Sequence, residues 1–300
     1  MSVEKIQNEF VIAPDPENPK LTEKVMGFDQ SGVSKETFVS VERPLTLFLN
    51  GQEIVTMMTI CDYPEYLAVG YLTNQNMLNS SDQITGIEYD EDIETVVVRT
   101  KQVSNFEEKL KKKTLTSGCA QGTIFGDVME KFDSIFLPPE AVIKTSWLYE
   151  LTRKINLTPS LYLAAGAIHG CVLCCKDQPL IYMEDVGRHN AVDKIAGYMF
   201  LNAMPGDDKI LYTTGRLTSE MVIKTAQMNI PILCSRSGFT AWGVELARKI
   251  NLGLIGRARG KRFIALAGTD RILFDAGSQE QGDVSEKEED KEEEKNVSCL

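Results

Sequence analysis

The chain is 300 residues long, and its 43% hydrophobic and 25% charged residues are typical of a globular protein, which excludes a fibrous or wholly disordered chain. Its net charge of −11 leaves no basic excess to neutralise phosphates, which argues against a nucleic-acid-binding protein. No apolar run approaches the roughly 20 residues that cross a bilayer, and the amino terminus lacks a secretory pattern, so we expect a cytoplasmic protein with no membrane contact and with its seven cysteines reduced.

The first third of the chain predicts a loose arm followed by a small α+β lobe. Residues 1–34 are rich in proline, asparagine, aspartate and lysine and show no sustained hydrophobic period, so we predict a loose arm there. The lobe, at residues 35–113, begins with a hairpin around Asn50-Gly51, a pair suited to a type I′ turn. The elements expected in this lobe are hairpin strands over 46–49 and 54–60, a helix over 64–74, strands over 84–89 and 95–100, and a charged helix over 106–113.

The second half of the chain alternates strands and helices, a pattern that predicts an α/β sheet covered by helices on its faces. We predict a mobile loop and linker over 114–138, the α/β domain over 139–277, and a disordered acidic tail over 278–300. Residues 279–300 hold nine acidic residues and three lysines, so they carry −6 of the net charge and leave −5 for the rest. The elements expected in the domain are helices over 139–155, 191–202, 218–228 and 241–250, and strands over 161–175, 180–184, 209–213, 231–234, 252–256 and 263–267.

The sequence Glu-Asp-Val-Gly-Arg-His-Asn-Ala-Val-Asp-Lys, at residues 184–194, runs from the end of a predicted strand into a helix. It brings acidic groups, Arg188 and His189 to the carboxyl end of a strand, where open α/β sheets bind their ligands. A helix cap with a surface ion pair accounts for the same residues equally well. A second strand-to-helix passage, at residues 213–224, carries Arg216 and a capping box, and it suits either phosphate binding at a helix N-terminus or a well-capped helix alone.

Cys119 lies in a small, polar, glycine-bearing loop rather than in core-like sequence, with a lysine run shortly before it. Nearby lysines lower the pKa of a thiol, so this setting suits a reactive thiol as well as an idle one. Cys171, Cys174 and Cys175 include a C-x-x-C spacing, but they lie in an apolar strand without the second pair that zinc would need. We therefore predict core thiols there, with a metal-binding or redox protein as the alternative.

A basic turn lies between the last two predicted strands. Residues 257–262 hold four cations, Arg257, Arg259, Lys261 and Arg262. In a net acidic protein such a concentration predicts a local anion site, and a solvated hairpin tip is the alternative.

Together these segments resemble the FdhD family of formate dehydrogenase accessory sulfurtransferases over residues 42–274, which leaves out the arm and the acidic tail. The residues that carry the resemblance are Glu42-Arg-Pro-Leu45, the strand with Met57-Met58 and its helix, Thr116-Ser-Gly-Cys119, residues 184–194, residues 215–224 and Arg262-Phe263. The resemblance implies a sulfur carrier that takes sulfur from a cysteine desulfurase as a persulfide. It then passes this sulfur to the molybdenum or tungsten bis(guanine dinucleotide) cofactor before the cofactor enters formate dehydrogenase.

The resemblance also implies structure and site residues. The domain at 139–277 is similar to the cytidine deaminase fold with its mixed sheet, and members look like homodimers that bind this cofactor as substrate and hold no metal of their own. By position, Cys119 is similar to the persulfide-bearing cysteine. The cofactor segment of the family falls on Phe263, Ile264, Ala265, Leu266, Ala267 and Gly268, and the further candidates for holding phosphates are Arg188, His189, Arg216 and Arg262.

One position departs from the family pattern. The family loop often reads C-x-x-C, whereas here the second position is Gly122. A dithiol relay within this loop therefore cannot form, and either Cys119 suffices or another cysteine comes close in space. The alternative function that this departure favours is a cofactor-binding chaperone without sulfur transfer.

Overall fold

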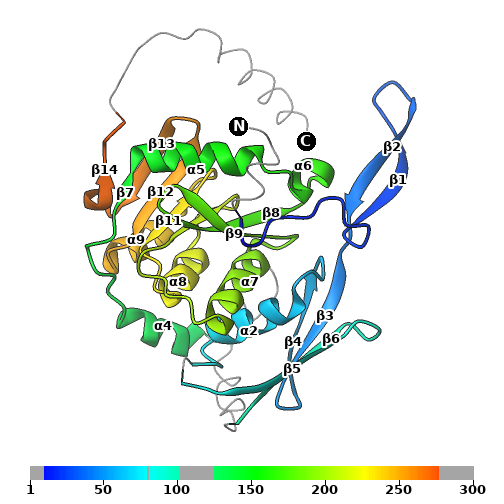
Figure 1. Ribbon diagram of the computed structural model, residues 1–300, viewed down its shortest axis with the longest axis horizontal. Coiled ribbons are helices and arrows are strands. Elements are labelled where there is room, and N and C mark those ends of the chain that lie inside the picture. Colours follow the sequence, from blue (N-terminus) through cyan, green and yellow to red (C-terminus); the bar gives the residue numbers. More distant parts are fainter. Residues whose placement is uncertain (1–9, 80, 102–124, 277–300) are drawn as a thin grey trace.

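The computed structural model describes residues 10–79, 81–101 and 125–276, which are arranged around one sheet of six strands and one of four (Figure 1). The larger sheet has the order β13-β12-β11-β10-β8-β9. Three parallel strands, β10, β11 and β12, are flanked by antiparallel partners, so the sheet is mixed, and the alternation of strands and helices in the sequence is confirmed. Its strands are β8 (His169–Cys175), β9 (Gln178–Asp185), β10 (Ile210–Thr213), β11 (Ile232–Ser235), β12 (Gly253–Arg259) and β13 (Arg262–Ala267).

Helices cover both faces of this sheet, because its strands send apolar side chains to both sides in alternation. One face carries α4, α7, α8 and α9, and the other carries α5. The bounds of these helices are α4 (Phe125–Asp133), α5 (Thr145–Leu157), α7 (Arg188–Leu201), α8 (Ser219–Gln227) and α9 (Ala241–Lys249). None of the helices in the described ranges has the length and apolar character needed to cross a bilayer.

The smaller sheet has the order β4-β3-β6-β5, and α2 (Pro64–Asn74) covers its core face. In the hairpin of β3 and β4, Leu49 pairs with Gln52, and Asn50 and Gly51 have φ angles of 51° and 87°. Both angles are positive, as a type I′ turn requires. The predicted hairpin is therefore confirmed, and the predicted helix and the two following strands are present as well. The bounds of the strands are β3 (Arg43–Leu49), β4 (Gln52–Thr59), β5 (Ile84–Asp90) and β6 (Thr95–Thr100).

The predicted loose arm over 1–34 is wrong in its described part. The backbone N–H of Val11 donates to the Leu180 carbonyl at 2.8 Å, so the chain runs along β9 there. Farther on, β1 (Thr22–Phe28) pairs with β2 (Ser34–Ser40) in a hairpin that projects from the body (Figure 1). Both faces of this hairpin are largely exposed, so its sequence lacks the alternation of apolar and polar residues that reveals a strand.

Three predicted boundaries also differ from the structure. Within the predicted loop and linker over 114–138, α4 forms because Val128 and Phe132, four residues apart, are buried. The helix predicted over 139–155 starts only at Thr145, because β7 (Ile143–Lys144) first pairs with β14 (Ile272–Leu273). The strand predicted over 161–175 starts as a short helix, α6 (Leu161–Ala165), which the Ser160 hydroxyl caps. The predicted helix over 106–113, the Cys119 loop and the acidic tail lie outside the described residues.

Glycines set the distance between α2 and α7, which join the two sheets. A Cβ atom at Gly70 would lie 1.7 Å from the carbonyl oxygen of Asp193, and one at Gly197 would lie 1.9 Å from the carbonyl oxygen of Tyr66. Atoms cannot approach this closely, so any side chain at either position forces the helices apart.

A buried ion cluster beside this crossing connects the same two parts of the chain. Lys194, at the centre, is completely buried and contacts the carboxylates of Asp185 at 2.6 Å and of Asp62. Burial alone lowers the pKa of Lys194, but the two carboxylates raise it above its usual value. Thr59 of β4 donates to Asp185 at 2.5 Å, and the side-chain amide of Asn190 donates to the same carboxylate at 3.0 Å. Three residues of the 184–194 motif, together with Thr59 and Asp62, thus form a structural junction.

We expect Gly70→Ala to lower the free energy of unfolding by about 3 kcal/mol or to prevent folding, because a methyl group there must displace backbone rather than a flexible side chain. Denaturant unfolding followed by circular dichroism measures this change. The matched control is Gly86→Ala, since a Cβ atom at Gly86 meets nothing within 4 Å. Equal stability of the two variants would contradict the glycine-limited crossing.

Candidate functional site

The carboxyl ends of the three parallel strands lie at one end of the larger sheet. There β10 leads into Thr213-Thr-Gly-Arg216, β11 into Ser235-Arg-Ser-Gly238, and β12 ends at Arg259. The first residue of β8, His169, and the last of β9, Asp185, pair in register at this same end. We call this region the carboxyl end of the sheet, and it is the place where open α/β sheets bind ligands.

Hydrogen bonds fix the segment after β10 against the start of β8. The backbone N–H of Thr214 donates to the Gly170 carbonyl at 2.9 Å, and the N–H of Gly170 donates to the Thr214 hydroxyl at 3.0 Å. Ser235 donates to the carbonyl of Gly215 at 2.6 Å. A Cβ atom at Gly215 would lie 3.0 Å from Cδ of Arg188, so the bare backbone of Gly215 lets the Arg188 side chain pack there.

The buried polar groups at the carboxyl end that have no hydrogen-bond partner in the described part of the chain include one of Arg188 and one of Thr218. Arg188 is 8% exposed, and its Nε atom is unpaired. The hydroxyl of Thr218, the N-cap residue of α8, is unpaired as well, and Arg216 is exposed two residues earlier. An unpaired buried donor is destabilising until a ligand accepts its hydrogen bond, and a helix N-terminus attracts anions. This arrangement suits a phosphate group.

The two histidines near this point have pKa values below the ordinary value, which favours their neutral forms at neutral pH. Burial lowers the pKa of His169, and the positive charges of Arg188 and Arg216 lower it further. Burial also lowers the pKa of His189, whose Nε2 lies 2.8 Å from a carboxylate oxygen of Glu220. The structure therefore brings Arg188 and Arg216 together as predicted anion ligands, whereas the Nε2 atom of His189 is engaged by Glu220.

The predicted cofactor segment lies on β13, at the opposite side of the sheet from β9. Five strand positions separate β13 from β9, which corresponds to about 24 Å. Arg262 starts β13 beside the carboxyl end, since it pairs with Arg259, but Ala267 pairs with Leu254 at the other end of the sheet. Phe263 packs between the rings of Tyr149 and Phe274. The Arg188 side chain packs against Gly215 after β10, so three strand positions, or about 14 Å, separate it from the predicted cofactor segment on β13.

Sequence reasoning missed two polar groups of the carboxyl end. Neither His169 nor Arg236, whose guanidinium lies 5.7 Å from the centre of the Tyr162 ring, is among the predicted anion ligands. The segment after β11 repeats the small-polar, arginine and glycine pattern that follows β10, and this repetition was the available signal. The predicted hairpin around the basic turn is confirmed by the pairing of β12 and β13.

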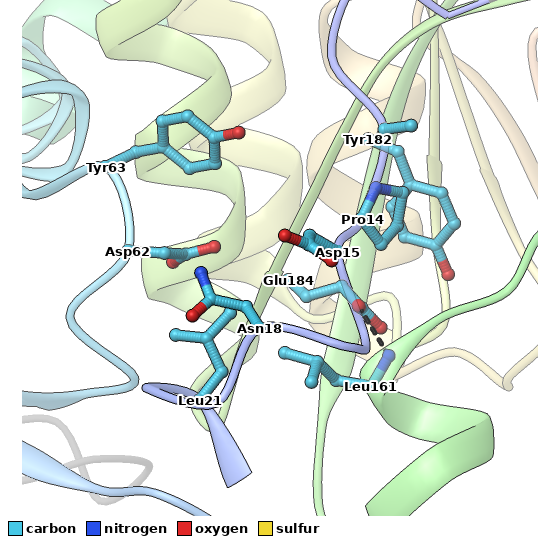
Figure 2. Close-up of a pocket in the computed structure, with 10 residues that line it drawn as sticks. Pro14, Asp15, Asn18, Leu21, Asp62, Tyr63, Leu161, Tyr182 and Glu184 are labelled. Atoms are coloured by element: carbon cyan, nitrogen blue, oxygen red, sulfur yellow. Dashed lines mark hydrogen bonds between the residues drawn. The ribbon is translucent and has the colours of Figure 1, made fainter. Parts of the chain in front are cut away.

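Glu184, the first residue of the 184–194 motif, serves a structural purpose. Its carboxylate accepts hydrogen bonds from the backbone N–H groups of Leu161 at 2.8 Å and Tyr162 at 3.2 Å, at the start of α6 (Figure 2). Burial raises the pKa of Glu184 to about 7, against the opposing effect of these two hydrogen bonds.

The cysteines that the structure describes are poor nucleophiles. Burial raises the pKa of Cys61 to about 11 and that of Cys171 to about 12, and it also raises those of Cys174, Cys175 and Cys234. Cys171 and Cys174 lie in different cores on opposite faces of the sheet, as predicted for core thiols. The described residues contain no group of three or more His, Cys, Asp and Glu side chains that could hold a metal ion. Cys119 lies outside the described residues.

Comparison with known proteins gives consistent results. The model of the FdhD/NarQ family matches residues 40–273. The sulfur carrier protein FdhD of Wolinella succinogenes is 30% identical over 259 residues, which cover 85% of this chain and 89% of that protein. The sulfur carrier protein FdhD of Bacillus subtilis is 29% identical over 265 residues, which cover 85% of this chain and 99% of that protein.

A crystal structure with the same overall fold is that of a putative formate dehydrogenase accessory protein from Desulfotalea psychrophila. It aligns with a TM-score of 0.68 at 24% identity, covering 84% of this chain and 99% of that one.

The raised pKa of Glu184 predicts a pH dependence of stability. Between its ordinary value of 4.5 and about 7, the folded chain keeps a proton that the unfolded chain has lost, so raising the pH across this window destabilises the fold. Across this window the free energy of unfolding falls by about 3 kcal/mol. Glu184→Gln should remove this decline in unfolding free energy measured from pH 5 to 8, whereas the exposed Glu17→Gln should keep it. An unchanged pH slope in Glu184→Gln would contradict the assignment.

Proposed function

The chain belongs to the FdhD/NarQ family, and we propose that it is a cytosolic sulfur carrier that serves a formate dehydrogenase. It accepts sulfur from a cysteine desulfurase as a persulfide on Cys119. It delivers this sulfur to the molybdenum or tungsten bis(guanine dinucleotide) cofactor, its substrate, before the cofactor enters the dehydrogenase. The substrate class follows from the family, and the chemistry of the carboxyl end supports it.

The observation that carries the cofactor part of this proposal is the unpaired Nε of Arg188. Arg188 is 8% exposed with its Nε unpaired, it lies near the unpaired Thr218 hydroxyl and the exposed Arg216, and this group of donors suits an anionic partner. The phosphates of a guanine dinucleotide have the matching charge and geometry. The lowered pKa of His169 favours its neutral form, which offers a hydrogen bond without adding charge.

The sulfur part rests on the family and on the other cysteines. Each of the five described cysteines has a raised pKa, so none of them is a ready thiolate at neutral pH. The segment with Cys119 joins β6 to α4 and carries the lysine run Lys111-Lys112-Lys113. Lysines close to a thiol favour the thiolate.

In the first transfer the Cys119 thiolate attacks the terminal sulfur of the donor persulfide. The sulfur–sulfur bond of the donor breaks, the donor cysteine leaves as a thiolate, and Cys119 holds the terminal sulfur. This is covalent catalysis with a group carrier. In the second transfer the sulfur–sulfur bond on Cys119 breaks, Cys119 leaves as a thiolate, and the terminal sulfur passes to the cofactor whose phosphates are held at the carboxyl end. The two electrons that convert this sulfur to sulfide would come from a thiol reductant or from the reduced metal of the cofactor.

The proposal extends to the fold and to assembly. The strand order β9-β8-β10-β11-β12, with β8 antiparallel to its neighbours, supports the cytidine-deaminase-like arrangement expected for this domain. A homodimer is the proposed assembly. This assembly rests on the family resemblance.

We expect Cys119→Ser to abolish activation of formate dehydrogenase in cells that lack their own sulfur carrier, because serine cannot hold a persulfide. Cys61→Ser is the matched control, since burial keeps that thiol protonated, and it should retain most activation. Full activation by Cys119→Ser would instead favour a cofactor-binding chaperone without sulfur transfer.

We expect Arg188→Gln to weaken binding of GDP, a probe for the guanine nucleotide half of the cofactor, by about tenfold or more, because a charge-assisted hydrogen bond contributes about 1.5–3 kcal/mol. Isothermal titration calorimetry measures this change, and thermal melting checks that the variant folds. Arg153→Gln, which removes an exposed arginine paired with Glu150 on α5, should change the affinity less than about twofold. Equal affinities for both variants would contradict the anion site at the carboxyl end.

A further inference from the structure

The segment of residues 10–21 closes a cavity on the side of the sheet formed by β9. The cavity has a volume of about 310 Å³ and lies between this segment, the residues before α2 and the start of α6 (Figure 2). We call it the strap cavity. It lies along β9, whereas the predicted cofactor segment is on β13 at the opposite side of the sheet.

Contacts within the chain hold the walls of the strap cavity in place. Ile12 bridges to Ile181 of β9, and the Tyr182 N–H donates to the Ile12 carbonyl at 2.9 Å. At the other end of the segment Leu21 is buried, and its N–H donates to the Asn18 carbonyl at 3.0 Å. Because these walls are already ordered, binding of a ligand costs little conformational entropy.

The polar part of the lining is negatively charged. Carboxyl groups of Asp15, Asp62 and Glu184 surround the same space in Figure 2. Glu184 adds its negative charge as the pH rises through about 7. Lys194 contacts both Asp62 and Asp185. One positive charge therefore faces two negative charges, and this group keeps a net negative charge. No lysine, arginine or histidine is among the described residues that line the cavity. Its charge therefore favours a cation.

The remaining lining is apolar and aromatic. Pro14, Leu21 and Leu161 provide apolar walls, and the ring of Tyr63, which is 38% exposed, faces the same space. Aromatic faces attract cations, and apolar walls accept the methylene groups of an alkyl chain. Glu184 is held against the backbone N–H groups that start α6, so its carboxyl group is fixed at the cavity wall.

We propose that the strap cavity binds an alkyl guanidinium or alkyl ammonium group, with the charge among Asp15, Asp62 and Glu184 and the alkyl chain against Leu21, Leu161 and Tyr63. A free metabolite and an arginine or lysine side chain of a docking protein both carry this chemistry. The cavity volume fits one such group.

Butylguanidine is the probe for the test, and its binding to the full-length protein is followed by NMR titration or calorimetry. We expect saturable binding in the millimolar range or tighter, and none by 1-butanol, which has the same alkyl chain without the charge. Binding should strengthen from pH 6 to pH 8, as Glu184 ionises beside Asp62, Lys194 and Asp15.

Asp15→Asn is the variant that tests the site, because Asp15 is exposed and is outside the buried ion cluster. We expect it to weaken butylguanidine binding by about fivefold. Glu17→Gln removes one charge from the same segment but does not line the cavity, and it should change binding less than about twofold. Thermal melting confirms that both variants fold.

A capped peptide with a single arginine distinguishes the source of the group. Binding of butylguanidine alone assigns the cavity to a small molecule, and binding of the peptide as well assigns it to a protein side chain. Absence of binding by both probes, or equal weakening by Asp15→Asn and Glu17→Gln, would overturn the proposal. Neither result bears on sulfur transfer by Cys119, so the two proposals fail independently.

Discussion

The junction between α2 and α7 decides how the two sheets of this chain are placed relative to each other. Backbone touches backbone at Gly70 and Gly197, and the completely buried Lys194 binds carboxylates from both parts of the chain. Removing one member of a buried ion cluster leaves an uncompensated charge, which is far more destabilising than losing a surface pair. The junction fixes α7 rigidly, and α7 begins with Arg188. The position of Arg188, the candidate anion ligand, therefore depends on the contact between α2 and α7.

The carboxyl end of the sheet shows the opposite physical pattern. The junction satisfies its buried charges, whereas Arg188 and Thr218 leave buried polar atoms unpaired in the described part of the chain. Unsatisfied groups of this kind reduce stability, and proteins keep them where a ligand completes the bonding. The 184–194 motif thus combines two functions. Its acidic and lysine residues hold the fold together, and its arginine is the proposed phosphate ligand.

The sequence permitted prediction of elements that depend on local interactions. The Asn50-Gly51 hairpin, the helix that starts at Pro64 and the alternating α/β domain follow from turn chemistry and hydrophobic pattern. The β1–β2 hairpin was missed because its exposed faces carry no apolar period, and α6 was missed because its cap includes the carboxylate of Glu184, 23 residues away. Of the candidate site, Arg188 and Arg216 were predicted from their positions after strands. The pairing of His189 with Glu220 and the lining of the strap cavity depend on contacts between distant residues, which a single sequence does not reveal.

The central claim is that Cys119 carries sulfur. Its most direct test is intact-mass spectrometry with peptide mapping after the protein is incubated with a cysteine desulfurase and L-cysteine. The account predicts one added sulfur atom on the Cys119 peptide, removed by reductant and absent from the peptides of Cys61 and Cys175, whose raised pKa values disfavour the thiolate. An unmodified Cys119 alongside a desulfurase that loads a known acceptor would contradict sulfur carriage and leave cofactor binding as the function.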